Sequence, residues 1–94
     1  MQHDSIIVKK EDLTNYHFVN YEVHLDSEII KERRWKLENG LVLGNDHKLK
    51  VRIVCLTTDG IIEVSATIWA VTDTHIELKS GRDIPIHSIM RVII

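Results

Sequence analysis

Residues 51–69, VRIVCLTTDGIIEVSATIW, decide how the rest of the chain is interpreted. They contain two largely apolar, β-prone runs on either side of Asp59-Gly60. Asp-Gly is a strong signal for a two-residue type I′ turn, because glycine accepts the positive φ that both central positions need and aspartate tolerates it. This stretch therefore predicts a β-hairpin.

The register of the hairpin follows if Asp59 and Gly60 form the loop, because Thr58 then pairs with Ile61. On the apolar face the expected pairs are Thr57 with Ile62, Cys55 with Val64, Ile53 with Ala66 and Val51 with Ile68. On the other face they are Leu56 with Glu63, Val54 with Ser65, Arg52 with Thr67 and Lys50 with Trp69. A slip of one residue would turn Glu63 toward the core, so the turn and the apolar pattern support the same register.

Length and composition are those of one small globular domain spanning residues 1–94. The hydrophobic fraction of 44% and the charged fraction of 28% are ordinary for this class. A formal net charge of −2 argues against a protein that coats DNA, although it permits a local basic stripe. The N-terminal residues form neither a secretory signal nor a membrane span. We therefore expect a cytoplasmic protein with no membrane partner.

The segments around the hairpin predict further short elements. Residues 17–25 alternate between apolar and polar and predict a half-buried strand. Asp26 and Ser27 can cap a helix, so we expect a short helix over residues 27–33, with an extended arm over residues 31–38 as the alternative. Asn39-Gly40 indicates a second tight turn. Residues 1–16 are expected to be either an edge strand or a docking tail.

After the hairpin, strands are expected at residues 75–79, 84–86 and 90–94, with one 3-10 turn at residues 87–89. Short strands separated by tight turns indicate a mainly β fold. We expect five to seven antiparallel strands and one short helix, closed as a small SH3/Sm-like barrel.

Residues 51–94 resemble the Sm-like and SH3-like small barrel proteins. VRIVCLTTDG is similar to the Sm opening of alternating aliphatic residues followed by glycine, and Asp73 with HIEL is similar to the mid-barrel aspartate and strand. His87 and Ile89 match the end of the bacterial Sm-like RNA chaperone, whereas Ser65 stands where the Sm family has glycine. The resemblance implies a barrel that binds RNA or, as in the bacterial Rho-inhibitor family, a protein.

The sequence provides no catalytic constellation. It contains no GxSxG motif, P-loop or Gly-rich dinucleotide loop. The six histidines lack the close spacing of a structural zinc site. The single cysteine, Cys55, lies on the expected core face and is predicted to be a buried apolar residue. We therefore expect a protein that is not an enzyme and that binds neither a metal ion nor a cofactor.

The face opposite the expected core carries Lys50, Arg52 and Trp69, and we take these residues with His87 as candidate binding residues. Cations beside an aromatic side chain are typical of proteins that bind single-stranded nucleic acids. Lys50 over Trp69 is equally consistent with a surface cation–π pair, and residues 17–25 could cover this face. The resulting hypothesis is a non-enzymatic module that binds a protein partner or self-associates into a homo-oligomer, with Sm-like RNA binding as the alternative.

Overall fold

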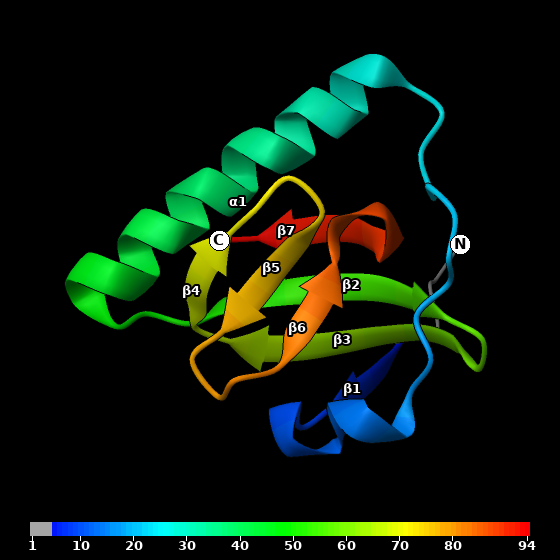
Figure 1. Cartoon of the computed structure of the whole chain (residues 1–94), viewed down its shortest axis with the longest axis horizontal. Helices are drawn as coiled ribbons and strands as arrows, with labels where there is room; N and C mark the ends of the chain where they lie inside the picture. The colour runs from blue at the N-terminus through cyan, green and yellow to red at the C-terminus, as the bar shows by residue number, and fades with distance from the viewer. Residues whose placement is uncertain (1–4) are drawn as a thin grey trace.

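Two β-sheets and one long helix make up the computed structural model, which describes residues 5–94 (Figure 1). The elements in chain order are β1 (Ile6–Val8), the 3-10 helix η1 (Lys10–Asn15), α1 (Ser27–His47), β2 (Val51–Thr57), β3 (Gly60–Ala66), β4 (Ile68–Val71), β5 (His75–Leu78), β6 (Asp83–Pro85), the 3-10 helix η2 (Ile86–Ser88) and β7 (Ile89–Ile93). The strand orders are β1-β3-β2-β7 and β4-β5-β6. The prediction of a mainly β fold is confirmed.

The β2–β3 hairpin has the predicted faces but a different register. Thr57 pairs with Gly60 and Cys55 pairs with Ile62, so the partners are displaced by two residues from those expected. The turn begins one residue early because the Thr57 hydroxyl donates to the Gly60 carbonyl (2.7 Å) and accepts from the Asp59 amide (3.1 Å). Gly60 then takes a φ of +114°, which glycine accepts. A shift of two residues leaves each side chain on its face, and Cys55 is fully buried as predicted.

The prediction of a helix over residues 27–33 is confirmed, but the helix is not short, because α1 has 21 residues. The alternative extended arm over residues 31–38 and the Asn39-Gly40 turn are wrong, because both lie within α1. Asp26 caps its first turn, as expected, by accepting from the Glu28 amide at 2.8 Å. Gly40 and Gly44 lie one helical turn apart where α1 packs against β4. A Cβ atom at Gly40 would lie 3.0 Å from the Ile68 Cδ1, and one at Gly44 would lie 2.3 Å from the Ile68 carbonyl oxygen. These glycines therefore serve close helix–sheet packing.

The strand predicted over residues 17–25 is also wrong. We call residues 16–26 the strap, because they run in irregular, mostly extended form from η1 to the start of α1 (Figure 1). Its backbone bonds go to two places: at the end of β2 the Thr58 amide donates to the His17 carbonyl (2.8 Å) and the Val19 amide donates to the Leu56 carbonyl (3.2 Å). At η2 the Val23 amide donates to the His87 carbonyl (3.0 Å). One isolated bridge joins Phe18 to Thr57. Since these partners belong to different elements, no continuous ladder forms.

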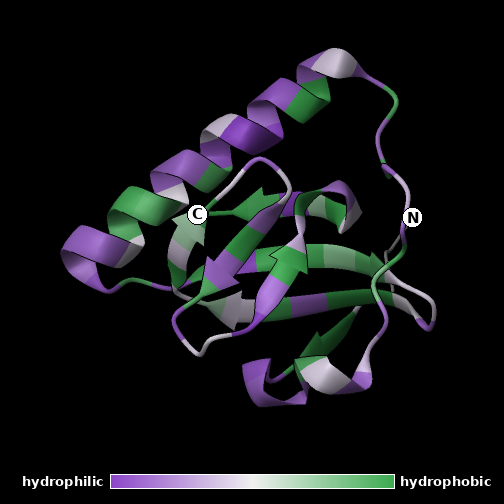
Figure 2. Cartoon of the chain, viewed as in Figure 1, coloured by the Kyte–Doolittle hydropathy of each residue, from purple (hydrophilic) through white to green (hydrophobic). Residues whose placement is uncertain are grey.

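The predicted antiparallel barrel is not closed. β3 ends at Ala66, and the chain passes through Thr67 into β4, which belongs to the second sheet. β7 pairs with β2 on one side only, and β1 pairs with β3 in parallel rather than antiparallel. The two sheets share a core in which the largest fully buried aliphatic side chains are Leu37, Ile53, Ile62, Ile68, Ile76, Leu78, Ile84 and Ile89. Figure 2 shows hydrophobic residues concentrated on the strands, whereas α1 alternates hydrophobic and hydrophilic residues.

The N-terminal segment includes the edge strand that was one of the two expectations for residues 1–16. β1 lies beside β3 at the outer edge of the first sheet, and Ile7 remains 80% exposed. The part of that prediction that concerns residues 1–4 lies outside the described residues. Across residues 5–94, neither α1 nor any other helix has the length and apolar character needed to cross a membrane.

Candidate functional site

The structure places the predicted binding residue Arg52 in an ion pair. Its guanidinium lies on the outer face of β2, with Nε at 2.7 Å and Nη2 at 3.3 Å from the two carboxylate oxygens of Glu63. This hydrogen bonding holds the pKa of Glu63 below its usual value and raises the pKa of Arg52. The charge of Arg52 is therefore already matched by a neighbouring carboxylate.

The other three predicted residues lie on separate elements. Trp69 on β4 is half-exposed, and the cation above its ring is Lys48 rather than Lys50, with Nζ 5.3 Å from the ring centroid. Lys50 is exposed in the connection before β2. His87 lies in η2 and its Nε2 donates to the Val19 carbonyl at 2.8 Å, so it fastens the strap. These four residues share no hydrogen bond or ion pair with one another.

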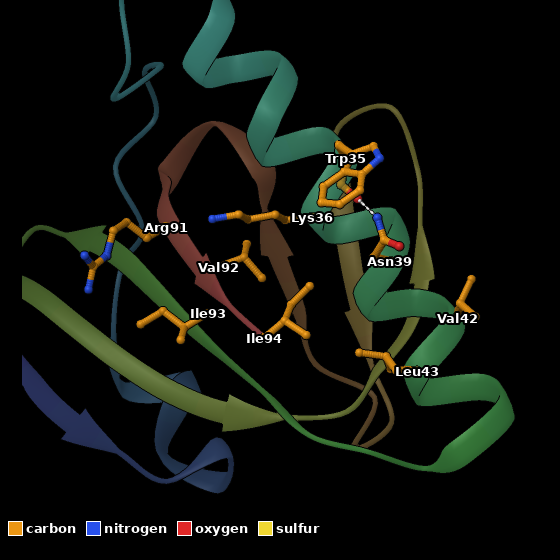
Figure 3. Close-up of a pocket in the computed structure, with 9 residues that line it drawn as sticks. All are labelled: Trp35, Lys36, Asn39, Val42, Leu43, Arg91, Val92, Ile93 and Ile94. Carbon is orange, nitrogen blue, oxygen red and sulfur yellow. Dashed lines mark hydrogen bonds between the residues drawn. The ribbon is translucent and has the colours of Figure 1, made fainter.

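A large hollow lies instead between α1 and β7 (Figure 3). Its volume is about 640 Å³. The lining side chains come from both elements and are mostly apolar: Trp35, Lys36, Asn39, Val42, Leu43, Arg91, Val92, Ile93 and Ile94. Trp35 is 63% exposed, Ile94 58% and Val42 53%. Exposed apolar side chains gathered along one hollow are typical of an interaction site.

A second hollow of about 250 Å³ extends the first toward the start of α1. It is lined by His24, Ile29, Glu32, Arg33, Lys36, Met90, Arg91 and Val92, and thus shares three residues with the first. We call the two hollows together the α1–β7 groove. Along α1 the groove runs from Ile29 to Leu43, which corresponds to roughly 21 Å at about 1.5 Å per helical residue. This length matches about six residues of extended chain at roughly 3.3 Å each.

One side of the groove is the outer edge of β7. The first carbonyl groups of this edge already accept hydrogen bonds from side chains. Arg33 Nη1 donates to the Ile89 carbonyl (3.0 Å) and His24 Nε2 donates to the Met90 carbonyl (2.7 Å). Among the described residues, the backbone of residues 91–94 forms no hydrogen bond outside the ladder with β2. In an antiparallel ladder every second residue directs its N–H and C=O away from the neighbour. Residues 91–94 therefore include peptide groups without a hydrogen-bond partner in the described chain at this edge, and such groups can pair with another strand.

A buried ion pair fixes the occupied end of the groove. Arg33 is 6% exposed and donates to both carboxylate oxygens of Glu22, at 2.7 and 2.6 Å. This hydrogen bonding keeps the pKa of Glu22 below its usual value, although partial burial opposes the shift. Since Arg33 also binds the Ile89 carbonyl, a single guanidinium joins α1, the strap and β7. The walls of the groove are thus held in place before anything binds.

A further hollow lies near η2 and contains charged side chains. Its volume is about 330 Å³ and it is lined in part by Glu22, Arg33, Arg34 and His87, but both arginines are engaged. Arg33 binds Glu22, and Arg34 donates to the carbonyls of Thr72 (2.9 Å) and Asp73 (3.2 Å). Within residues 5–94 no three metal-ligating side chains come together. The Thr74 hydroxyl, which also lines this hollow, is hydrogen-bonded to His75 Nδ1 at 2.8 Å.

The groove was not predicted because the helix was expected to end at residue 33, whereas α1 continues to His47. The groove residues of the helix, Ile29, Lys36, Asn39 and Leu43, recur at intervals of three, four or seven residues, which places them on one face of a helix. This spacing was the available signal, together with the Asp26 cap. The Asn39-Gly40 pair favours a turn, so this helical spacing was not recognised.

Comparison with known proteins gives no match among models of protein families, among curated proteins or among solved structures.

Proposed function

We propose that this chain is a non-enzymatic protein-binding module that takes an extended segment of a partner protein into the α1–β7 groove. The observation that carries the proposal is the unpaired edge of β7 beside an apolar helix wall. A segment added to such an edge gains affinity from main-chain hydrogen bonds and specificity from the side chains that line the groove.

The groove favours a single segment over a second copy of the chain. α1 lies beside β7 (Figure 1). In a dimer that pairs the β7 edges of two copies, the α1 helices of both copies would therefore compete for the same space beside the joined edges. An added segment brings only a strand. The length of the groove, about six extended residues, and the exposed apolar groups of Trp35, Val42 and Ile94 fit such a segment.

The test is selection of a phage-displayed library of random seven-residue segments on the purified full chain. Wild type and the variant Leu25→Lys should retain the same segments, because Leu25 is fully exposed and does not line the groove. Val42→Glu and Ile94→Lys should weaken binding of the selected segments at least tenfold, since each places a charge in the apolar part of the groove.

Hydrogen exchange provides the second readout. Addition of a synthetic copy of a selected segment should slow amide exchange within residues 91–94, because strand addition gives these amides partners. Binding that survives both groove substitutions, or that leaves exchange there unchanged, would refute the proposal. A dimer in sedimentation analysis that Ile94→Lys converts to a monomer would make a second copy the occupant instead.

The fold relationship and the cellular location also belong to this proposal. The order of hairpin, Gly81 turn, 3-10 turn and last strand over residues 51–94 supports kinship with SH3-like and Sm-like proteins. The ordinary composition and one buried cysteine support a soluble protein of the cytoplasm. RNA binding has less support, because Arg52 is paired with Glu63 and the ring of Trp69 is covered by Lys48.

A further inference from the structure

Two cations flank the middle of the α1–β7 groove. Lys36 from α1 and Arg91 from β7 both line its two hollows. Figure 3 shows Lys36 extending from the helix across the groove toward β7. Among the described residues, neither side chain forms a hydrogen bond or an ion pair, since the ion pairs are Lys31–Glu28, Arg33–Glu22 and Arg52–Glu63.

The nearby carboxylates do not cancel this charge. Glu22 is bound by Arg33, and Glu63 is bound on both oxygens by Arg52, although it also lies within the electrostatic reach of Arg91. Glu32 lines only the hollow near the start of α1. Lys36 and Arg91 therefore remain without an ion pair among residues 5–94, and they lie on two different sides of β7: Lys36 faces the edge from α1, whereas Arg91 points to the outer face of the sheet, near Glu63.

We infer that the segment bound in the groove carries a carboxylate side chain at its centre, with aliphatic side chains beside it; this inference rests on the proposed function. Arg91 pairs with Val54 and so points to the outer face of the sheet. The residue of an added strand directly opposite Arg91 would point to the same face, with its Cβ roughly 5 Å away. The adjacent residues would point toward α1, where Lys36 lies.

The aliphatic positions follow from the same alternation. Beyond Lys36, the wall of α1 continues with Val42 and Leu43, and Ile94 lies opposite them across the groove (Figure 3). A side chain of the segment that faces α1 at this end meets only apolar groups. The groove thus selects an acidic residue with an aliphatic one at a distance of one or three positions along the segment.

The experiment compares segments selected from the random seven-residue library by three forms of the full chain: wild type, Lys36→Glu/Arg91→Glu and Lys79→Glu. Lys79 is exposed and does not line the groove, so its reversal is the matched control. Wild type and Lys79→Glu should enrich segments with a central Asp or Glu. The double variant should enrich segments with a central Lys or Arg.

Synthetic peptides then give the magnitude. Replacing the central acid of a selected peptide by its amide should weaken binding to wild type about threefold, as expected for one exposed charge pair. The same change should leave binding to Lys36→Met/Arg91→Met unaltered. Thermal unfolding of each variant verifies that it is folded.

Three outcomes overturn the inference. Segments enriched by wild type without an acidic preference would refute the charge recognition while leaving the protein-binding function intact. Identical preferences for wild type and the double charge reversal would do the same. Failure to enrich any segment would refute the proposed function and, with it, this inference.

Discussion

Replacing Gly44 by alanine should destabilise the fold, although alanine is the better helix former. A Cβ atom at this position would lie 2.3 Å from the Ile68 carbonyl oxygen, whereas ordinary contacts begin at 3.4 Å. Either α1 or β4 must therefore move by about 1 Å. The atom that is met belongs to the backbone of a strand, which cannot swing away as the end of a side chain can.

The magnitude follows from two opposing contributions. Glycine to alanine in a helix interior gains about 1 kcal/mol of intrinsic helix stability. Overpacking costs about 1–3 kcal/mol, and a clash with backbone belongs at the upper end of that range. We expect the free energy of unfolding to fall by about 2 kcal/mol for Gly44→Ala, and the Tm to fall by about 8–16 °C in a domain of this size.

Gly40→Ala is the matched control. Its Cβ would lie 3.0 Å from the Ile68 Cδ1, the flexible end of a side chain, so the gain and the cost should nearly cancel. Urea unfolding of both variants followed by circular dichroism measures the difference. A Gly44→Ala variant as stable as wild type would refute the close helix–sheet contact, and a strongly destabilised Gly40→Ala would restore the turn at residues 39–40.

Three further predictions concern the buried and charged groups. Glu22→Gln should lower the free energy of unfolding by about 2 kcal/mol, because Arg33 would stay buried without a countercharge; chemical denaturation measures this, and an unchanged midpoint would count against the ion pair. The pKa values of Glu22 and Glu63 lie below the ordinary 4.5, so their stabilisation is complete above that pH and is lost as the pH falls through their lowered values. Urea midpoints measured from neutral pH downward should therefore decrease below about pH 4.5, and Glu22→Gln should flatten the decrease. Burial raises the pKa of the Cys55 thiol, so a thiol reagent at pH 8 should label Cys55 only after unfolding, and rapid labelling of the native chain would contradict its burial.

The central hairpin shows what local sequence could determine. Alternation fixed which side chains of β2 and β3 face inward, and this prediction is confirmed by the burial of Ile53 and Val64. The register was wrong by two residues because the hydroxyl of Thr57 bonds within the turn. Turn propensity alone does not include that side-chain contribution. The alternation of apolar and polar residues therefore predicted the hairpin more reliably than its turn residues did.

The helix shows where local signals are overridden. Asn39-Gly40 is a strong turn signal by itself, but Gly40 and Gly44 recur at the spacing that brings a helix backbone close to β4. That contact involves residues more than twenty positions apart, so no window of sequence contains it. The α1–β7 groove depends on the same helix, which explains why the predicted site residues lie elsewhere.

The guanidinium of Arg33 has a consequence for the motions of the molecule. Because it bonds to Glu22 of the strap and to the Ile89 carbonyl from its place on α1, these three segments are expected to open in one concerted step. Separation of one of these three segments from the other two at this end of the groove is therefore disfavoured. Amide exchange in the strap and in the first turns of α1 should then report one common opening free energy, below that of global unfolding.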